Sequence, residues 1–255
     1  EMSEKGFTLC VEEGEAVLPG DKVARVVQAT DGNPPSVIRL GPGLRQDGTY
    51  VVSVRAGLVR TQTERSKLWL ETTGRRYVPA PEDMVIGIVL DRHAEGYRLD
   101  IGAQEPAQLN SLSFEGATKK NRPYLEPGAL VYARVTVADR DMEPEISCIQ
   151  PGSNKSWISG ESLFGELSGY GSLIRVSLSA ARALLKPSCA LLNALGESIS
   201  QGFEFVVGMN GRVWIRASAP RDAIFIAAAV RMAEAGSLGP DPAKGVRTLL
   251  KSSSF

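Results

Sequence analysis

The stretch FEFVVGMNGRVWIRA, residues 203–217, places two runs of β-branched and aromatic residues on either side of Gly208-Met209-Asn210-Gly211. An Asn-Gly pair between such runs predicts a β-hairpin, because both residues tolerate positive φ. The same Gly-x-x-Gly quartet is also the pattern with which KH domains clamp four nucleotides of a single strand. The quartet is therefore either a structural turn or an RNA-binding loop, and its position among the neighbouring elements decides between the two.

The elements predicted around this hairpin are those of a KH domain. In chain order, the pattern predicts a strand over 173–177, a helix that begins at Ser179, a helix over 188–199, the hairpin, and a helix over 220–235. Ser179 and Ser188 suit helix caps, and Pro220 suits the first turn of a helix. We expect the apolar face of the last helix to comprise Ile224, Ala227, Ala228 and Met232. The order β-α-α-β-β-α is that of a KH module.

The junction between the first two helices decides how the glycine quartet is interpreted. In a KH module the nucleotide-clamping Gly-x-x-Gly lies at this junction. Here the junction is LLKPSC, residues 184–189, which contains no glycine. Lys186 would meet a phosphate only as a point charge, without a backbone clamp around it. We therefore interpret Gly208, Asn210 and Gly211 as a structural motif, in which glycine serves the turn or allows another backbone to pack closely.

The chain upstream of this module is rich in strand signals. Strand patterns occur over 84–90, 97–101, 107–109, 130–137 and 145–149. Five strands in so short a segment predict a closed barrel of the OB type, because closure hides the exposed strand edges. Before them, short Val, Ile and Thr runs alternate with Pro-Gly-Asp, Gly-Pro-Gly and Asp-Gly turns, which predicts a β-sandwich or barrel-like domain.

The predicted fold is mainly β with an α+β C-terminal part. We place a boundary before Pro79-Ala80-Pro81, since each proline also restrains the residue before it. The predicted domains are an N-terminal β domain over 1–77, the OB-type barrel over 78–150, the KH domain over 151–237 and a mobile tail over 238–255.

Composition sets limits on the class of protein. The chain has 255 residues, of which 43% are hydrophobic, and its 29 basic residues balance 29 acidic ones. No overall field therefore draws it to nucleic acid or to a membrane. Cys10, Cys148 and Cys189 are far apart and lack Cys-x-x-Cys spacing, which argues against a disulfide framework and structural zinc. With no apolar run of about 20 residues and no signal pattern, we expect a soluble protein of a reducing, intracellular compartment.

The sequence shows little that would support catalysis. His93 is the only histidine and lies in a predicted turn, and the chain has no Walker loop, dinucleotide fingerprint, zinc-binding histidine pair or nucleophile elbow. Acidic residues on a predicted hairpin loop could hold Mg²⁺, but a solvated turn is the simpler interpretation; they are Asp139, Asp141, Glu143 and Glu145. We therefore predict no catalytic residue, no metal and no cofactor.

One segment of the barrel favours nucleic acid. Residues 78–150 carry twelve acidic and seven basic side chains, and three of the basic ones lie together in ATKKNRPY, residues 117–124. In OB-type barrels, loops and one face bind single strands through basic groups on phosphates and aromatic rings on bases. We predict that Lys119, Lys120, Arg122 and Tyr124 bind RNA.

Three groups of segments resemble one known family. They are VLPGDKV and GPGL near the start, YRLDIG, FEGATKKNRPYLEPGALVYARV and DRDMEPEISC in the barrel, and FGELSGYGSLIRVSLSAARALL with GMNG in the KH module. Together, over roughly residues 11–235, they resemble the eukaryotic RNA exosome cap subunits of the ribosomal RNA-processing protein forty type. The hairpin Gly-x-Asn-Gly with a glycine-free helix junction is the most specific mark.

The resemblance implies a non-catalytic subunit of a nuclease complex. It implies that the barrel is an S1 domain and that the protein sits, with other S1/KH cap subunits, on a ring of RNase PH-like subunits. Single-stranded RNA would pass the loop of Lys119, Lys120 and Arg122 on its way to the pore, for 3'-5' processing or degradation by associated nucleases. The loop would bind RNA weakly and without sequence preference. The resemblance also implies a location in the nucleus and nucleolus, and in the cytoplasm.

Two other hypotheses remain open at this point. The same modules could form a free-standing S1-KH RNA-binding protein of translation or transcription. A metal-dependent nuclease that uses the acids between Asp139 and Glu145 is the second.

Overall fold

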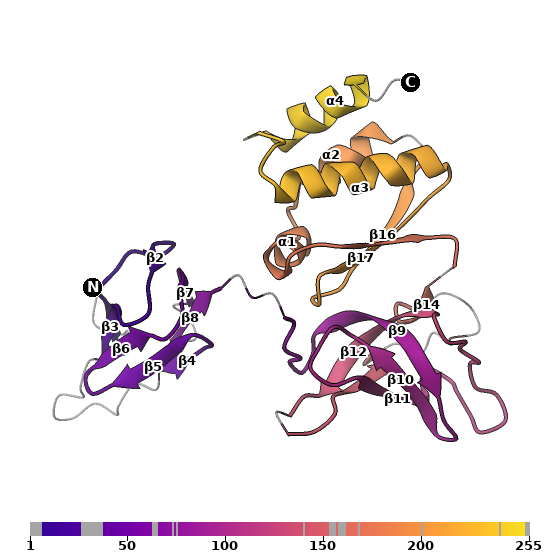
Figure 1. Ribbon diagram of the computed structural model, residues 1–255, viewed down its shortest axis with the longest axis horizontal. Helices are drawn as coiled ribbons and strands as arrows, with labels where there is room; N and C mark the ends of the chain where they lie inside the picture. The colour runs from indigo at the N-terminus through magenta and orange to yellow at the C-terminus, as the bar shows by residue number, and fades with distance from the viewer. Residues whose placement is uncertain are drawn as a thin grey trace. The chain divides into compact units, whose positions relative to one another are not determined.

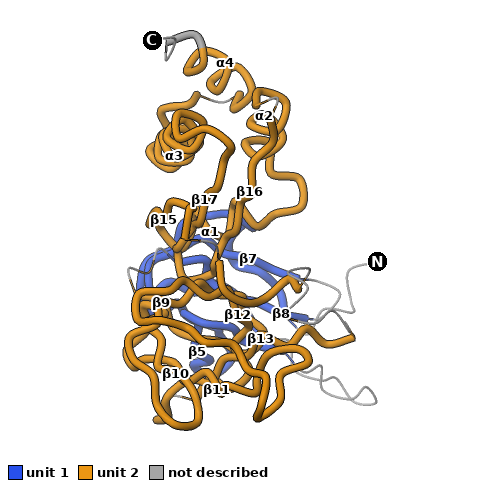
Figure 2. The backbone as a smooth tube through the Cα atoms, turned by 90° about the vertical axis from the view of Figure 1, so that its right-hand side faces the viewer, with its two compact units in different colours: residues 1–73 blue, residues 74–255 orange. Residues whose placement is uncertain are grey.

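A computed structural model gives the fold of the chain. It describes residues 7–26, 38–62, 66–72, 74, 76–139, 141–152, 157, 162–167, 169–199, 201–239 and 241–252. The chain forms two compact units, residues 1–73 and 74–255, which Figure 2 shows in separate colours. Tyr77, assigned by its sequence context to the N-terminal domain, is buried in the core of the second unit, where its hydroxyl donates to Asp83 Oδ2 at 2.7 Å.

The described residues of the first unit form two four-stranded sheets. One has the order β1 (Phe7–Leu9), β3 (Lys22–Val26), β6 (Tyr50–Ser53), β5 (Leu44–Asp47), and the other β2 (Ala16–Val17), β7 (Gly57–Gln62), β8 (Lys67–Glu71), β4 (Arg39–Leu40). Val23, Val51, Val59 and Leu68 are fully buried in their common core. The β-rich pattern of the N-terminal sequence thus gives a two-sheet β domain, as its alternating burial requires.

The second unit begins with the predicted OB-type barrel. Its strands are β9 (Met84–Arg92), β10 (Gly96–Asp100), β11 (Ala107–Phe114), β12 (Leu130–Val137) and β13 (Glu145–Cys148), and β14 (Gly165–Leu167) adds to β12. The barrel closes because β13 pairs with β12 on one side and, in parallel, with β11 on the other. Closure leaves a core of fully buried side chains that includes Ile86, Leu99 and Val131.

The KH module follows within the same unit (Figure 1). Its elements are β15 (Ser172–Arg175), α1 (Leu178–Leu184), α2 (Ala190–Ser198), β16 (Phe203–Val207), β17 (Arg212–Ala217), α3 (Pro220–Glu234) and α4 (Pro242–Ser252). The sheet has the order β15-β17-β16, and all its pairs are antiparallel. The mainly β fold with an α+β C-terminal part is therefore confirmed. No helix in the described ranges is long and apolar enough to cross a bilayer.

Strand β17 explains why the barrel and the KH module form one unit. Side chains alternate between the two faces of a strand, so Val213 and Ile215 lie in the core beneath the KH helices while Trp214 lies in the barrel core. All three are at most 2% exposed. The sheet is thus covered by helices on one face and by the barrel on the other.

Both predicted helix caps were wrong. The N-cap of α1 is Ser177, whose Oγ accepts from the amide of Ala180 at 3.3 Å, while Ser179 is the second helical residue. The N-cap of α2 is Cys189, which makes no side-chain capping bond. In each case the predicted serine lies within two residues of the observed cap, and the backbone turn before the helix decides which residue is extended.

The predicted face of α3 and the predicted tail also differ from the structure. Ile224 is 70% exposed, and the buried residues of α3 are Ile226, Ala229 and Val230. The run AIFIAAAV is apolar all round, so hydrophobic spacing does not select one face. Residues 242–252 form α4 instead of a mobile tail, because Ala243, Val246 and Leu249 recur at three-residue spacing and pack into the KH core. Residues 253–255 lie outside the described ranges.

Candidate nucleic-acid interface

The basic loop connects β11 and β12 and is held in place by one buried tyrosine. Tyr97 of β10 is 2% exposed, and its hydroxyl donates to the carbonyl of Pro123 at 2.6 Å. The same oxygen accepts from the amide of Leu125 at 3.3 Å. A buried hydroxyl that satisfies both neighbours of Tyr124 fixes the backbone there, so the exposed side chains of the loop project from a defined base.

The structure brings the four predicted RNA-binding residues onto one loop beside the β9–β10 turn. Lys119, Lys120 and Arg122 are exposed. Arg122 Nη1 lies 3.3 Å from Ser111 Oγ and 3.4 Å from the carbonyl of Ala94. Both contacts of Arg122 are long and go to neutral groups, and within the described residues none of the three cations forms an ion pair, so they are available to phosphates.

Arg92, which the sequence analysis did not single out, joins this cluster. Its guanidinium carbon lies 4.4 Å from the centroid of the Tyr124 ring, a cation–π contact. Arg92 is on the last position of β9 and Tyr124 lies 32 residues later, so no sequence spacing would have paired them. The cluster therefore contains four cations and one ring that is 66% exposed.

A hollow of about 250 Å³ lies on the barrel between the β9–β10 turn and strand β13. Strands 2 and 3 and the adjoining loops of OB folds are the usual place for a single strand. Here, however, the hollow is lined by Glu95 and Glu145, and Glu143 lies beside it, where its Oε2 accepts from the side-chain Nε2 of Gln108 at 2.6 Å. Carboxylates repel phosphate, so this face is a poorer site for an RNA backbone than the basic loop.

His93 and the acidic hairpin show no catalytic arrangement. His93 lies in the turn that follows β9, with Nδ1 3.4 Å from Asp91 Oδ1 and Nε2 3.1 Å from Gln108 Oε1. Asp139 Oδ1 accepts from the amide of Asp141 at 3.0 Å, as in a solvated turn. Across the described ranges, no three His, Cys, Asp or Glu side chains are grouped so that they could hold a metal ion.

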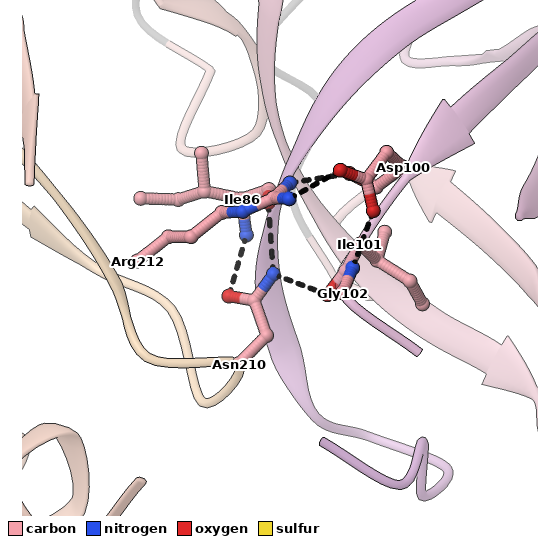
Figure 3. A network of polar contacts seen from close by, with 6 residues as sticks. All are labelled: Ile86, Asp100, Ile101, Gly102, Asn210 and Arg212. Carbon is pink, nitrogen blue, oxygen red and sulfur yellow. Dashed lines mark hydrogen bonds and ion pairs between the residues drawn. The ribbon is translucent and has the colours of Figure 1, made fainter. Parts of the chain in front are cut away.

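The glycine quartet lies in the β16–β17 hairpin, and its Asn210 packs against β9 and the residue that follows β10 (Figure 3). Asn210 is 9% exposed, and its Nδ2 donates to the carbonyls of Ile86 and Ile101 at 2.9 and 2.8 Å. Its Oδ1 accepts from the amide of Ile86 at 3.3 Å. The Asn210 side chain thus pairs with both the amide and the carbonyl of Ile86, as a neighbouring strand would. This contact agrees with a structural motif, because the side chain has no free face for a nucleotide.

Glycine is required at two positions of this hairpin by close backbone contacts. A Cβ on Gly208 would lie 2.8 Å from the amide nitrogen of Ile86. Gly211 has φ +74°, and a Cβ there would lie 2.5 Å from the carbonyl oxygen of Val176. Lys186, in the glycine-free turn between α1 and α2, is exposed and has no backbone clamp, since that turn is closed by the bond from the Cys189 amide to the Lys186 carbonyl.

Arg212 and Asp100 complete the interface between the KH module and the barrel, and neither was predicted from the sequence. Arg212 is 3% exposed, and its guanidinium donates to the carbonyls of Ile86 (3.1 Å) and Asp100 and to Asp100 Oδ2 (2.6 Å). The signal in the sequence was present: Arg212 directly precedes the apolar run Val213-Trp214-Ile215 of the same strand. A buried arginine needs such partners, because an unpaired buried charge is strongly unfavourable.

The Asp100 carboxylate should make the stability of the interface between the KH module and the barrel sensitive to acid. Burial by itself raises the pKa of Asp100, but the hydrogen bond from the Gly102 amide and the charges of Arg212 and Arg175 outweigh it, so the pKa is lowered. A lowered folded pKa gives stabilisation that is present above the ordinary aspartate pKa of about 3.9 and is lost as pH falls through the folded value. Urea unfolding between pH 7 and pH 3 should therefore show a smaller acid-induced loss for Asp100→Asn than for the parent; parallel profiles would contradict this.

Three segments, which together make up about two thirds of the chain, match known protein families. Residues 38–76 match the family described as exosome complex exonuclease Rrp40 N-terminal domain, residues 77–160 match exosome complex component RRP40, S1 domain, and residues 171–221 match KH domain.

Curated proteins of the same name are similar along most of their length. Exosome complex component rrp40 of Schizosaccharomyces pombe is 40% identical over 92% of both chains. Exosome complex component RRP40 of Homo sapiens is 35% identical over 86% of this chain and 79% of its own. The RRP40 of Drosophila melanogaster is 38% identical over 86% and 88%.

A solved structure shows the same fold. The crystal structure of a protein described as an exosome complex RNA-binding protein has a TM-score of 0.54 and 18% identity, and the match covers 69% of this chain and 97% of that one.

Proposed function

The chain belongs to the family of exosome complex component RRP40, and from that premise we propose that it is a non-catalytic cap subunit that guides single-stranded RNA into the exosome. The partners would be RNase PH-like ring subunits and the other S1/KH cap subunits, and the RNA would go on to 3'-5' processing or degradation by associated nucleases. One observation supports this role most directly: the exposed cluster of Lys119, Lys120, Arg122 and Arg92 on an otherwise acidic barrel.

The arrangement of charges explains how the subunit would act. Phosphate contacts hold a strand without reading its bases, so the loop would bind RNA weakly and without sequence preference. Several cap subunits around one pore would add their contributions through effective concentration. The carboxylates of Glu95, Glu143 and Glu145 on the neighbouring face would keep the strand on the basic side of the barrel.

Replacing Lys119, Lys120 and Arg122 together by alanine should impair RNA passage without unfolding the chain. In a complex reconstituted with ring and cap subunits, we expect RNA affinity at low salt to fall at least about tenfold. The slope of log affinity against log salt should decrease by about 2, since each lost phosphate contact removes about 0.7. RNase protection of a long unstructured RNA measures passage toward the pore.

A matched variant controls for net charge. Lys186, Lys244 and Arg247 are exposed basic residues of the KH module, so their triple alanine variant removes the same charge at a different place. This control should bind RNA nearly as the parent does. Equal protection by the parent and the loop variant would overturn the proposed role of the loop.

The two other hypotheses make different predictions. A free-standing S1-KH RNA-binding protein should bind RNA tightly as an isolated chain and elute alone when mixed with ring subunits; the relatives that match along most of this chain are named exosome components, which favours the cap role. A nuclease should cleave labelled RNA in Mg²⁺ or Mn²⁺. The pairing of Asp139 with its own turn and of Glu143 with Gln108 supports a non-catalytic subunit.

For location, we propose the nucleus and nucleolus, with a cytoplasmic fraction. The family membership is the ground for this proposal. Microscopy of a tagged full-length protein tests it.

A further inference from the structure

An aromatic hollow of about 330 Å³ opens beside the basic loop of the S1 barrel. Its apolar lining consists chiefly of Phe114, Pro123, Tyr124, Trp157, Leu163 and Phe164. Phe114 and Phe164 are 2% and 5% exposed and belong to the barrel core, whereas Tyr124 and Leu163 are 66% and 54% exposed. The hollow therefore combines a rigid aromatic floor with an accessible rim.

The polar groups of the hollow do not suit a phosphate. Glu166 is the one charged side chain among the described lining residues, and its pKa is raised by partial burial and by the nearby Glu126. A carboxylate repels a phosphate but accepts hydrogen bonds from amino and ring N–H groups. The hollow thus suits a flat, apolar group that carries N–H donors at its edge.

Two buried polar atoms next to the hollow also lack partners. Trp157 lines the hollow, and its indole Nε1 is buried without a hydrogen bond inside the described part of the chain. The same holds for Oε2 of Glu115, whose carbonyl accepts from the backbone amide of Trp157 at 3.0 Å. Buried polar atoms are usually satisfied, so an unpaired donor and an unpaired acceptor at neighbouring residues point to a partner that offers both.

Tyr124 connects the hollow to the basic loop. Its ring lines the hollow, and the guanidinium of Arg92 lies over that ring. Lys119, Lys120 and Arg122 precede it by two to five residues and are exposed. A strand whose phosphates lie on these cations therefore has one of its bases within reach of the hollow.

We propose that the hollow binds one nucleobase of the single-stranded RNA. The base stacks on the aromatic ring of Tyr124 while the basic loop holds the adjacent phosphates. This inference rests on the proposed RNA-guiding function and deepens it. Stacking tolerates every base because each has a π-face, so the site adds affinity without reading sequence. It also adds a contribution that salt does not screen, and this distinguishes it from the phosphate contacts.

The test uses the reconstituted complex, with the full-length chain alone at low salt as a second arm. The probes are an unstructured oligoadenylate and an abasic ribose-phosphate oligomer of the same length, which carries the same charge without bases. Tyr124→Leu removes the ring, and Tyr124→Phe retains it. Tyr170→Leu is the matched control, because Tyr170 is 94% exposed and does not line the hollow.

We expect Tyr124→Leu to weaken oligoadenylate binding by about tenfold with an unchanged salt slope, and to leave binding of the abasic oligomer unaltered. Tyr124→Phe and Tyr170→Leu should bind as the parent does. In addition, RNA that contains 4-thiouridine should crosslink to Tyr124 or Trp157 on irradiation, with the site mapped by mass spectrometry.

The outcomes separate this inference from the proposed function. If the Lys119, Lys120 and Arg122 variant weakens binding but Tyr124→Leu does not, and no crosslink maps to the hollow, the base-binding inference fails and the guiding function stands. If neither variant changes binding, the guiding function itself fails. If Tyr124→Leu leaves RNA binding intact but prevents assembly with the other subunits, the hollow is a protein-docking site and the inference is overturned.

Discussion

Gly211→Val should lower the free energy of unfolding of the second unit by about 4 kcal/mol. Of this, about 1–3 kcal/mol comes from holding a non-glycine residue at φ +74°, and about 1–3 kcal/mol from forcing a side chain against the Val176 carbonyl, 2.5 Å from the Cβ position. For a domain of this size the midpoint of thermal unfolding should fall by roughly 10 °C. Calorimetry of the full chain measures both quantities.

Gly202→Val separates the two causes. Gly202 has φ +72°, but a Cβ there would meet no atom within 4 Å, so this variant carries the conformational strain without the collision. It should be destabilised by about half as much as Gly211→Val. Equal losses for both would show that close packing of the hairpin contributes nothing, and an unchanged melt of Gly211→Val would overturn the structural interpretation of the motif.

Arg212→Met should cost about 2–4 kcal/mol, because it removes the guanidinium donor from the carbonyl and the carboxylate of Asp100 and leaves Asn210 as the side-chain donor to the carbonyl of Ile86. The lower end allows for water that reaches Asp100, whose side chain is 39% exposed. The loss of stability should be localised at the interface between the KH module and the barrel. Hydrogen exchange of the amides of β9 should accelerate in Arg212→Met, while that of the first unit should not.

A double-mutant cycle with Asp100→Asn apportions this loss. If the guanidinium–carboxylate contact matters beyond the two backbone bonds, the double variant should be more stable than the sum of the single losses predicts, by about 1 kcal/mol. Arg216→Met is the control, because Arg216 is on the same strand but pairs with Glu204 at the surface. A loss for Arg212→Met no larger than that of Arg216→Met would contradict the assigned role.

The sequence predicts what depends on local pattern. The strand pattern over 130–137 predicts the bounds of β12 as the structure has them, and Asn210-Gly211 predicts the β16–β17 hairpin. Backbone preference and period two are local properties, so they are visible without the rest of the fold. The same holds for the basic loop, whose four predicted residues lie together because they are neighbours in the chain.

What depends on distant partners was missed. The apolar face of α3 was predicted only in part: Ala227 and Met232 pack against the KH core, but Ile224 is exposed, because helix, sheet and α4 together decide which side is buried. Arg92 over Tyr124, Arg212 on Asp100 and Trp214 in the barrel core each join segments that no spacing rule connects. The hollow beside Tyr124 could not be predicted for the same reason, since it is formed by the end of β11, the basic loop and the chain before β14, which are far apart in the sequence.

The contact between the β16–β17 hairpin and the barrel also limits the order in which the second unit can fold. Asn210 reaches Ile86 across 124 residues of sequence, and contacts of such long range form late and slow folding. During synthesis, at about 5–20 residues per second, Ile86 of β9 leaves the ribosome roughly 6–25 s before Asn210. Until Trp214 has left the ribosome, the apolar surface of the barrel that it later covers is exposed to water. We therefore expect the nascent barrel to bind chaperones and to be prone to misassociation.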